Sequence, residues 1–200
     1  MSFKIRCYRP DDFNAIYKIC LETGDSGKDA TELFNDPDLL GHLYSGPYVI
    51  LEPESAFILE DAMGPCGYII GALDSESFYK KMNDLWLPQI RKKYTDPKPG
   101  LTQWTKDEEL IHHLFHPKEP VILPDYPSHL HIDLLSRAQG QGQGKKMMDH
   151  FFQYLKVNHS KGIHLGLSIH NNRAFHFYKQ YGMTELFRNS DAIIMGFSFE

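Results

Sequence analysis

The sequence predicts an α/β domain of the mixed (α+β) type, in which helices flank a central mixed sheet of about six to seven strands. Three observations predict this class. Short stretches of alternating apolar and polar residues occur in both halves of the chain, apolar residues at helical spacing lie between them, and glycine or proline separates most segments. A length of 200 residues fits a single domain, 1–200, with one inserted segment.

The chain opens with a predicted strand and a helix. Residues 3–8 alternate as the strand, and Pro10 with the two aspartates after it favours a helix start. Apolar residues then recur at helical spacing and predict one buried stripe. The stripe is formed by Phe13, Ile16, Tyr17 and Cys20.

A second short helix and a hairpin follow. The helix is predicted over 37–45, with Gly46-Pro47 as its stop. Two strands are predicted near 55–61 and 66–73, and the turn Met63-Gly64-Pro65 between them indicates a hairpin.

Residues 75–128 form a predicted helical insertion between the third and fourth strands. The stretch contains Trp86, Trp104 and two helical patterns, near 76–94 and 106–115. A long connection within a compact domain is often a lid or a binding element. The alternative is a decoration that only packs on the core, and the sequence leaves both open.

The C-terminal half predicts the order strand, helix, strand, helix, strand, strand. The first helix follows a glycine-rich turn and ends near Asn158. Asn171 can cap the second helix, which Gly182 ends. The strands are expected over 129–135, 163–169, 183–187 and 191–198.

The glycine-rich turn predicts an anion site. Its alternating glycines let a backbone approach a ligand closely, and the helix after it offers unpaired N–H groups. A dinucleotide fingerprint would need glycine where Lys145 or Met147 stands, and a P-loop would need a hydroxyl where Lys146 stands. Neither nucleotide motif fits, and a flexible turn without a ligand is the alternative. The turn reads Gln139-Gly140-Gln141-Gly142-Gln143-Gly144-Lys145.

The same turn resembles the acyl-coenzyme-A pattern of the GNAT superfamily of N-acetyltransferases, Q/R-x-x-G-x-G/A, with Gln139, Gly142 and Gly144 at the defining positions. Residues 171–183 are similar to that superfamily's N-x-x-A-x-x-x-Y-x-x-x-G-F signature, with methionine in place of the final phenylalanine. A narrower likeness, carried by residues 36–41 and 126–135, is to the acetyltransferase-like domain of protein O-GlcNAcases and to free-standing bacterial relatives.

This resemblance implies a GNAT-like fold and an enzyme. The sheet would be mostly antiparallel, and its fourth and fifth strands would splay apart so that coenzyme A enters as a pseudo-strand. The implied reaction is transfer of an acetyl group from acetyl-CoA to a primary amine, by direct attack in a ternary complex. The alternative is a non-catalytic acyl-CoA-binding or interaction domain.

The resemblance also implies the residues that bind the cosubstrate. Leu134 would bind the pantetheine arm through its backbone, and N–H groups from Gln141 to Lys145 would cradle the pyrophosphate. Asn171 would contact the coenzyme arm or only cap its helix. The implied set is Leu134, Leu135, Gln139, Gly140, Gln141, Gly142, Gln143, Gly144, Lys145 and Asn171.

Three residues are candidates for the chemistry. Tyr178 would act as general acid toward the departing thiolate, and the alternative is a core tyrosine. His131 and Asp133 share one face of a predicted strand, so either could line the acceptor cleft or serve as the base. A structural role for each is the alternative.

Metal and nucleic acid are not expected. His112, His113 and His116 lie on a predicted helix, and His129-x-His131-x-Asp133 on a strand, but no His-Glu-x-x-His pattern occurs. Lys+Arg 21 against Asp+Glu 26 gives a net charge of −5, which disfavours general nucleic-acid binding.

The remaining expectations concern location and partners. The three cysteines are scattered, and neither an apolar run long enough to span a bilayer nor a signal-peptide pattern is found. We therefore expect a cytoplasmic protein with no membrane partner. The resemblance implies that its substrate is a small-molecule or peptide amine. Dimers are common in families of this kind, which leaves a homodimer open.

Overall fold

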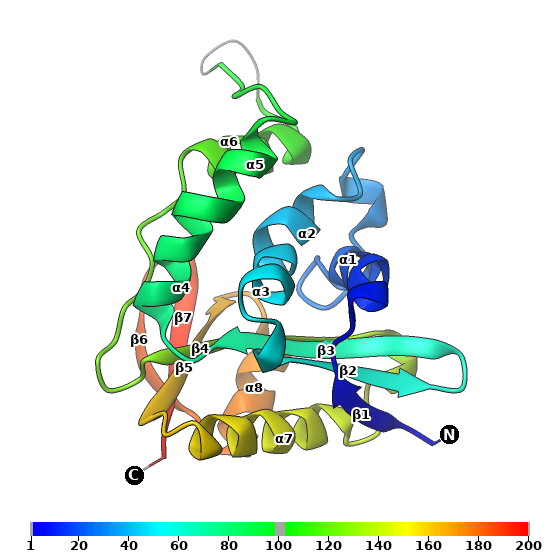
Figure 1. The fold of residues 1–200 in the computed structure, drawn as a ribbon, viewed down its shortest axis with the longest axis vertical. Coiled ribbons are helices and arrows are strands. Elements are labelled where there is room, and N and C mark those ends of the chain that lie inside the picture. The colour runs from blue at the N-terminus through cyan, green and yellow to red at the C-terminus, as the bar shows by residue number, and fades with distance from the viewer. Residues whose placement is uncertain (1, 99–102, 200) are drawn as a thin grey trace.

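The computed structural model describes residues 2–98 and 103–199. Among these residues one sheet has seven strands in the order β1-β2-β3-β4-β5-β7-β6 (Figure 1). Every neighbouring pair is antiparallel except β4 with β5. The mixed, mostly antiparallel sheet predicted from the sequence is confirmed. The strands are β1 (Lys4–Cys7), β2 (Ala56–Asp61), β3 (Gly64–Ala72), β4 (Ser128–Leu134), β5 (Gly162–Ser168), β6 (Thr184–Arg188) and β7 (Ala192–Ser198).

Three helices of the N-terminal half cover one face of the sheet (Figure 1): α1 (Phe13–Glu22), α2 (Leu39–Tyr44) and α3 (Gly46–Leu51). The predicted stop at Gly46-Pro47 is half wrong, because α2 ends there but α3 begins at once. Proline fits the first turn of a helix, where its missing N–H is not needed. Glycine is required at 46 because a Cβ there would lie 2.8 Å from the Trp86 ring.

The insertion between β3 and β4 is helical in its described part. It contains α4 (Ser75–Lys81), a π-helical stretch (Met82–Trp86), α5 (Leu87–Arg91) and α6 (Lys106–Phe115). The helix predicted over 76–94 therefore ends earlier and is interrupted. Pro88 supplies the reason, because its ring nitrogen cannot bond back into the preceding turn, and the ladder widens just before it.

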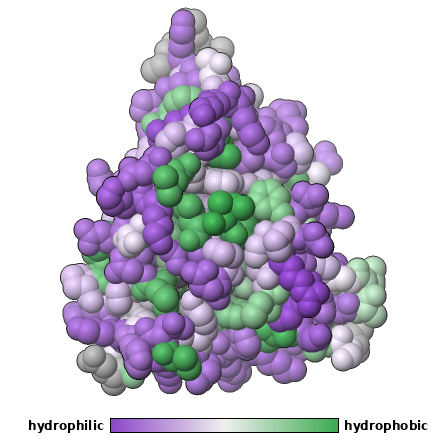
Figure 2. Space-filling view, viewed as in Figure 1, coloured by the Kyte–Doolittle hydropathy of each residue, from purple (hydrophilic) through white to green (hydrophobic). Residues whose placement is uncertain are grey.

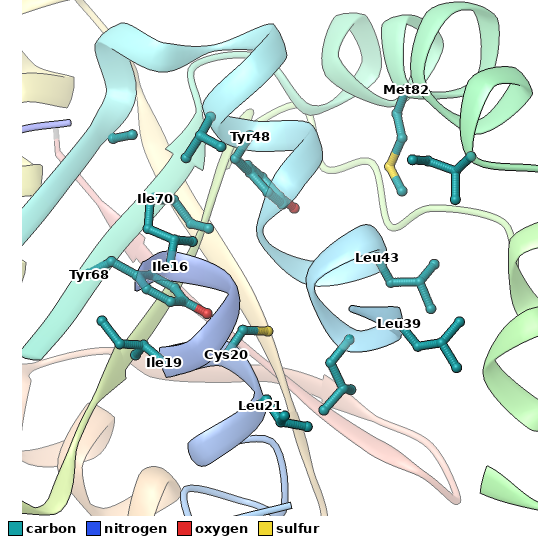
Figure 3. Packing of buried hydrophobic residues seen from close by; sticks show 14 of the residues in the cluster. Ile16, Ile19, Cys20, Leu21, Leu39, Leu43, Tyr48, Tyr68, Ile70 and Met82 are labelled. Atoms are coloured by element: carbon teal, nitrogen blue, oxygen red, sulfur yellow. The ribbon is translucent and has the colours of Figure 1, made fainter. Parts of the chain in front are cut away.

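The opposite face of the sheet is covered by α7 (Gln143–Val157) and α8 (Asn172–Tyr181) (Figure 1). Side chains alternate along β3, so Tyr68 and Ile70 face α1 while Ile69 faces α7. Two buried apolar clusters result, one on each face, and Figure 3 shows part of the first with Tyr68 beside Ile16 and Cys20. Among the described residues, no helix is long and apolar enough to span a bilayer.

The described part of the insertion belongs to the first apolar cluster. Phe78, Leu87 and Leu114 are buried in it. The Trp86 indole donates a hydrogen bond to the His42 carbonyl at 2.8 Å, and the Tyr94 hydroxyl donates to Asp36 at 2.7 Å. These bonds fasten the insertion (described residues 75–98 and 103–127, called the arm below) to α2 and to the loop before α2. This supports packing on the core as the role of α4 and α5.

The molecular surface is narrow where the insertion lies and broad over the sheet (Figure 1 and Figure 2). In Figure 2, which has the view of Figure 1, the molecule narrows toward the α5 and α6 end. Apolar side chains gather in the middle of this face, and polar side chains cover most of its margin.

Trp86→Ala is expected to lower the free energy of unfolding by about 2–3 kcal/mol, because a large ring and a hydrogen bond to α2 are lost together. Urea unfolding followed by circular dichroism measures the change. Leu85→Ala is the control, since the neighbouring Leu85 is 59% exposed and should change stability little. Equal stability of the two variants would mean that Trp86 does not anchor the arm.

Candidate functional site

The parallel strands β4 and β5 are paired only at their first residues. Pairing is limited to Ser128 with Ile163 and His129 with His164, although β4 continues to Leu134 and β5 to Ser168. The strands therefore splay beyond His129, as the sequence resemblance implied.

The free edge of β4 carries backbone polar groups. The Leu135 N–H donates to the Cys66 carbonyl of β3 at 2.9 Å. Because backbone groups of an antiparallel strand alternate in direction, those of Leu134 and Ile132 point away from β3, toward β5. The Leu134 carbonyl accepts a hydrogen bond of 2.6 Å from the Gln139 side chain. This edge can bind an extended ligand as an added strand would.

The glycine loop ends at the start of α7. Gly140 and Gly142 have φ of +69° and +71°, a region that side chains disfavour. A Cβ at either position would meet nothing within 4 Å, so backbone conformation rather than crowding requires glycine. Gly142 is the N-cap of α7 and offers no side-chain bond to the N–H groups of the first turn. An anion could supply that cap.

Three loop residues make contacts that the sequence did not predict. Gly144 lies against α8, where a Cβ would be 3.2 Å from the Phe177 ring. Gln143 is buried and donates to the Gln141 carbonyl at 3.0 Å, which braces the loop. The Lys145 ammonium lies 2.7 Å from Asp149, one turn along α7.

Arg173 of α8 joins three segments at the loop, and sequence reasoning did not identify it. Its guanidinium donates to the Gln139 side chain at 2.7 Å. It also lies against Gly27 of the α1–α2 connection, where a Cβ would be 2.2 Å from Nη2. Asn171, two residues before, caps α8 by accepting from the Ala174 N–H at 3.0 Å. Its expected contact with the coenzyme stays a prediction.

Tyr178 is the buried residue of α8, with 8% of its surface exposed. Burial raises the pKa of its hydroxyl, and the charge of Asp133 raises it further. Among the described residues, no partner bonds this hydroxyl. The phenol therefore stays protonated at any physiological pH and has a hydrogen to donate.

Asp133 of β4 lies opposite Tyr68 of β3, whose hydroxyl donates to its carboxylate at 2.6 Å. Burial raises the pKa of Asp133 to about 6, and the hydrogen bond from Tyr68 opposes that shift. Tyr68 is a residue of this site that no sequence motif indicated. The alternation along β3 indicates its face, but only the register with β4 places it beside Asp133.

Four side chains form a hydrogen-bonded chain that ends at His131. The Ser75 hydroxyl lies 2.6 Å from the Pro127 carbonyl and 2.8 Å from His129 Nδ1. The Tyr48 hydroxyl lies 2.8 Å from His129 Nε2 and 3.0 Å from His131 Nε2.

The direction of each bond in this chain follows from its first acceptor. A carbonyl only accepts, so Ser75 donates to Pro127 and accepts from His129 Nδ1–H. His129 Nε2 must then accept from Tyr48, and Tyr48 must accept from His131 Nε2–H. Among the residues that the structure describes, none bonds His131 Nδ1, which keeps a lone pair for a ligand. Burial lowers the pKa of His131 to about 4, so the ring is neutral at pH 7.

Comparison with known proteins gives the class. The model of the acetyltransferase (GNAT) family matches residues 42–183, so the chain belongs to that family. The crystal structure of SsHAT superposes with a TM-score of 0.90 at 35% sequence identity, covering 99% of this chain and 98% of that one. An N-acetyltransferase, PaiA of Thermoplasma acidophilum in complex with coenzyme A, shares the fold with a TM-score of 0.63 at 12% identity.

Among curated proteins, the chain is similar to the protein O-GlcNAcase of Rattus norvegicus, with 31% identity over 202 residues. The protein O-GlcNAcase of Mus musculus matches to the same extent. The match covers 97% of this chain but spans only 22% of the relatives' length. Family membership indicates an N-acetyltransferase-type enzyme, and the similar structures share its fold.

Gly142→Val should abolish the rise in melting temperature that coenzyme A produces, because the new side chain distorts the positive-φ loop and fills its open side. Differential scanning fluorimetry with coenzyme A measures it. Gly64→Val is the matched control, since Gly64 has φ +104°, equally open space and a place in the β2–β3 turn. If both variants keep the wild-type shift, the loop is not the pyrophosphate site.

Proposed function

We propose that this chain transfers the acetyl group of acetyl-CoA to a primary amine of a small molecule or peptide, by direct attack in a ternary complex. One observation carries the proposal. Beyond the point where β4 and β5 part, β4 carries the candidate base Asp133 and leads to the glycine loop and the uncapped start of α7. Asp133 is close enough to Tyr178 for the charge of Asp133 to raise the pKa of Tyr178.

The residues present fit acetyl-CoA. The N–H groups of the glycine loop and the first turn of α7 would bind the pyrophosphate, and Arg173 provides a positive charge beside the loop. The free edge of β4 at Ile132 and Leu134 would bind the amide groups of the pantetheine arm, whereas the Leu135 N–H already bonds the Cys66 carbonyl of β3. Gln139, which now bonds the Leu134 carbonyl, would have to release it for an arm bonded there.

Asp133 is the better of the two candidate bases. Burial raises the pKa of Asp133 to about 6 and lowers that of His131 to about 4, so Asp133 is the stronger base of the two. Its negative charge also attracts an ammonium group, whose pKa near 10.4 makes proton removal necessary. His131 would line the acceptor cleft, with Nδ1 accepting a hydrogen bond from the substrate.

Tyr178 would stabilise the leaving group. The amine nitrogen bonds to the acyl carbon, the carbon–sulfur bond breaks, and the electron pair of that bond stays on sulfur. The ammonium group loses its first proton to solvent before the attack, Asp133 takes the second as the amide forms, and the Tyr178 hydroxyl donates a hydrogen bond to the sulfur. A thiol ionises near pKa 8.5, well below the raised pKa of Tyr178, so the thiolate is stabilised mainly by this hydrogen bond.

A thiol-release screen with acetyl-CoA over a panel of amines tests the function. The panel should contain polyamines, amino sugars, aminoglycosides and lysine peptides, with product masses to confirm acylation. Release that needs the amine supports the proposal. Coenzyme A binding without release from any amine class would instead identify a non-catalytic acyl-CoA-binding domain.

Tyr178→Phe should slow turnover about 10²–10³-fold, the usual cost of losing one hydrogen-bond donor to a developing negative charge, while the fold and the affinity for coenzyme A are kept. The ring remains in the core and only the hydroxyl is lost. Steady-state kinetics on a verified amine measure the drop, which should shrink for an acyl donor with a better leaving thiol. Tyr181→Phe is the control, since that hydroxyl bonds Asp149 instead. Unchanged turnover in Tyr178→Phe would remove the residue from the mechanism.

Wild-type kcat/KM should rise as pH increases through about 6, because Asp133 must be ionised to accept a proton. Asp133→Asn should lose that limb of the profile and most of the activity. The fold should survive, because asparagine still accepts from Tyr68 and avoids burying a charge. Asp84→Asn, at an exposed carboxylate on the arm, is the control. An unchanged limb in Asp133→Asn would assign it to another group.

A further inference from the structure

A second group of polar side chains gathers in the inserted arm. Asp96, from the segment after α5, places one carboxylate oxygen 3.0 Å from His112 Nδ1 and the other 2.6 Å from His116 Nε2. One nitrogen or oxygen atom from each of the three residues lies within 4.8 Å of the others. Two segments that are sixteen or more residues apart in sequence thus present three donor atoms to one point.

His112 and His116 are positioned so that one ion can contact both side chains. They are four residues apart on the last turn of α6 and its C-cap, which puts them on the same side of the helix. Their rings lie 4.2 Å apart, and Trp104 packs against His112 at 4.6 Å and restricts its rotation. The side chains of Asp96, His112 and His116 are 35%, 33% and 56% exposed, so an ion from solvent can reach them.

We propose that Asp96, His112 and His116 bind a zinc ion, with water completing a tetrahedral shell. Imidazole nitrogen and carboxylate oxygen are common zinc ligands, at about 2.0–2.2 Å from the metal. Without an ion, the one carboxylate of Asp96 is shared by two imidazole rings whose centres lie 4.2 Å apart. A cation at the centre lets both ring lone pairs and the carboxylate point inward.

The ion would act on the arm and not on acetyl transfer. It would fasten the segment after α5 to the end of α6 and so close the connection between the two helices with a bond stronger than the hydrogen bonds seen there. The histidine spacing alone did not favour a metal, because the third donor, Asp96, lies sixteen residues before His112 and becomes visible only in the fold. The proposal is independent of the proposed function.

Titration of the chelator-treated full chain tests the site, with Zn²⁺ in isothermal calorimetry and Co²⁺ in absorption spectroscopy. Wild type should bind one Zn²⁺ per chain in the micromolar range, show tetrahedral Co²⁺ bands and melt at a higher temperature with zinc. Asp96→Asn and His116→Ala should each lose the tetrahedral bands and the zinc-dependent rise in melting temperature.

His113→Ala is the matched control, because His113 lies on the same helix outside the donor set and should retain metal binding. No saturable zinc binding by wild type would overturn the proposal and leave a hydrogen-bonded triad. So would zinc binding that both Asp96→Asn and His116→Ala retain, since the ion would then lie elsewhere. Circular dichroism of each variant before titration separates loss of the site from loss of the fold.

Discussion

The early separation of β4 and β5 is the constraint on which the site depends. β4 is bonded to β3 along its whole length, from Ala72 opposite His129 to Gly67 opposite Leu134, so its course is set by that neighbour. β5 is bonded equally fully to β7. Each strand follows its antiparallel partner, and the two can meet only at their beginnings. The half of β4 that leads to the glycine loop therefore has one edge available to a ligand.

Polar side chains on the face of β4 that α1, α2 and α3 cover connect this site to the rest of the fold. His129, His131 and Asp133 alternate along the strand and are enclosed by elements from the N-terminal half and the insertion. Burying such groups is costly unless each finds a hydrogen-bond partner. Tyr48 and Tyr68 meet that requirement and also decide which atoms remain free for chemistry. Fold stability and the ionisation of the site are consequently coupled.

The start of the insertion supports this arrangement of buried polar side chains. Its more distant part holds a separate polar cluster. Ser75, the first residue of α4, anchors the hydrogen-bonded chain that orients His131. The π-helical stretch before Pro88 brings Trp86 onto α2. Farther out, the Asp96, His112 and His116 cluster joins the segment after α5 to α6. One connection thus supports the site at one end and carries an unrelated polar cluster at the other.

Periodicity and the two motifs are local properties, and they were enough to predict a mixed sheet of six to seven strands, most of the helices to within a few residues, and the family. Local patterns also placed a glycine loop before α7 and a cap at Asn171. Three features could be seen only in the folded chain: Gly46 starts a helix, Tyr68 bonds Asp133, and Tyr48 links two histidines. These facts depend on strand register and on packing between segments far apart in the chain, and neither leaves a trace in the spacing of neighbouring residues.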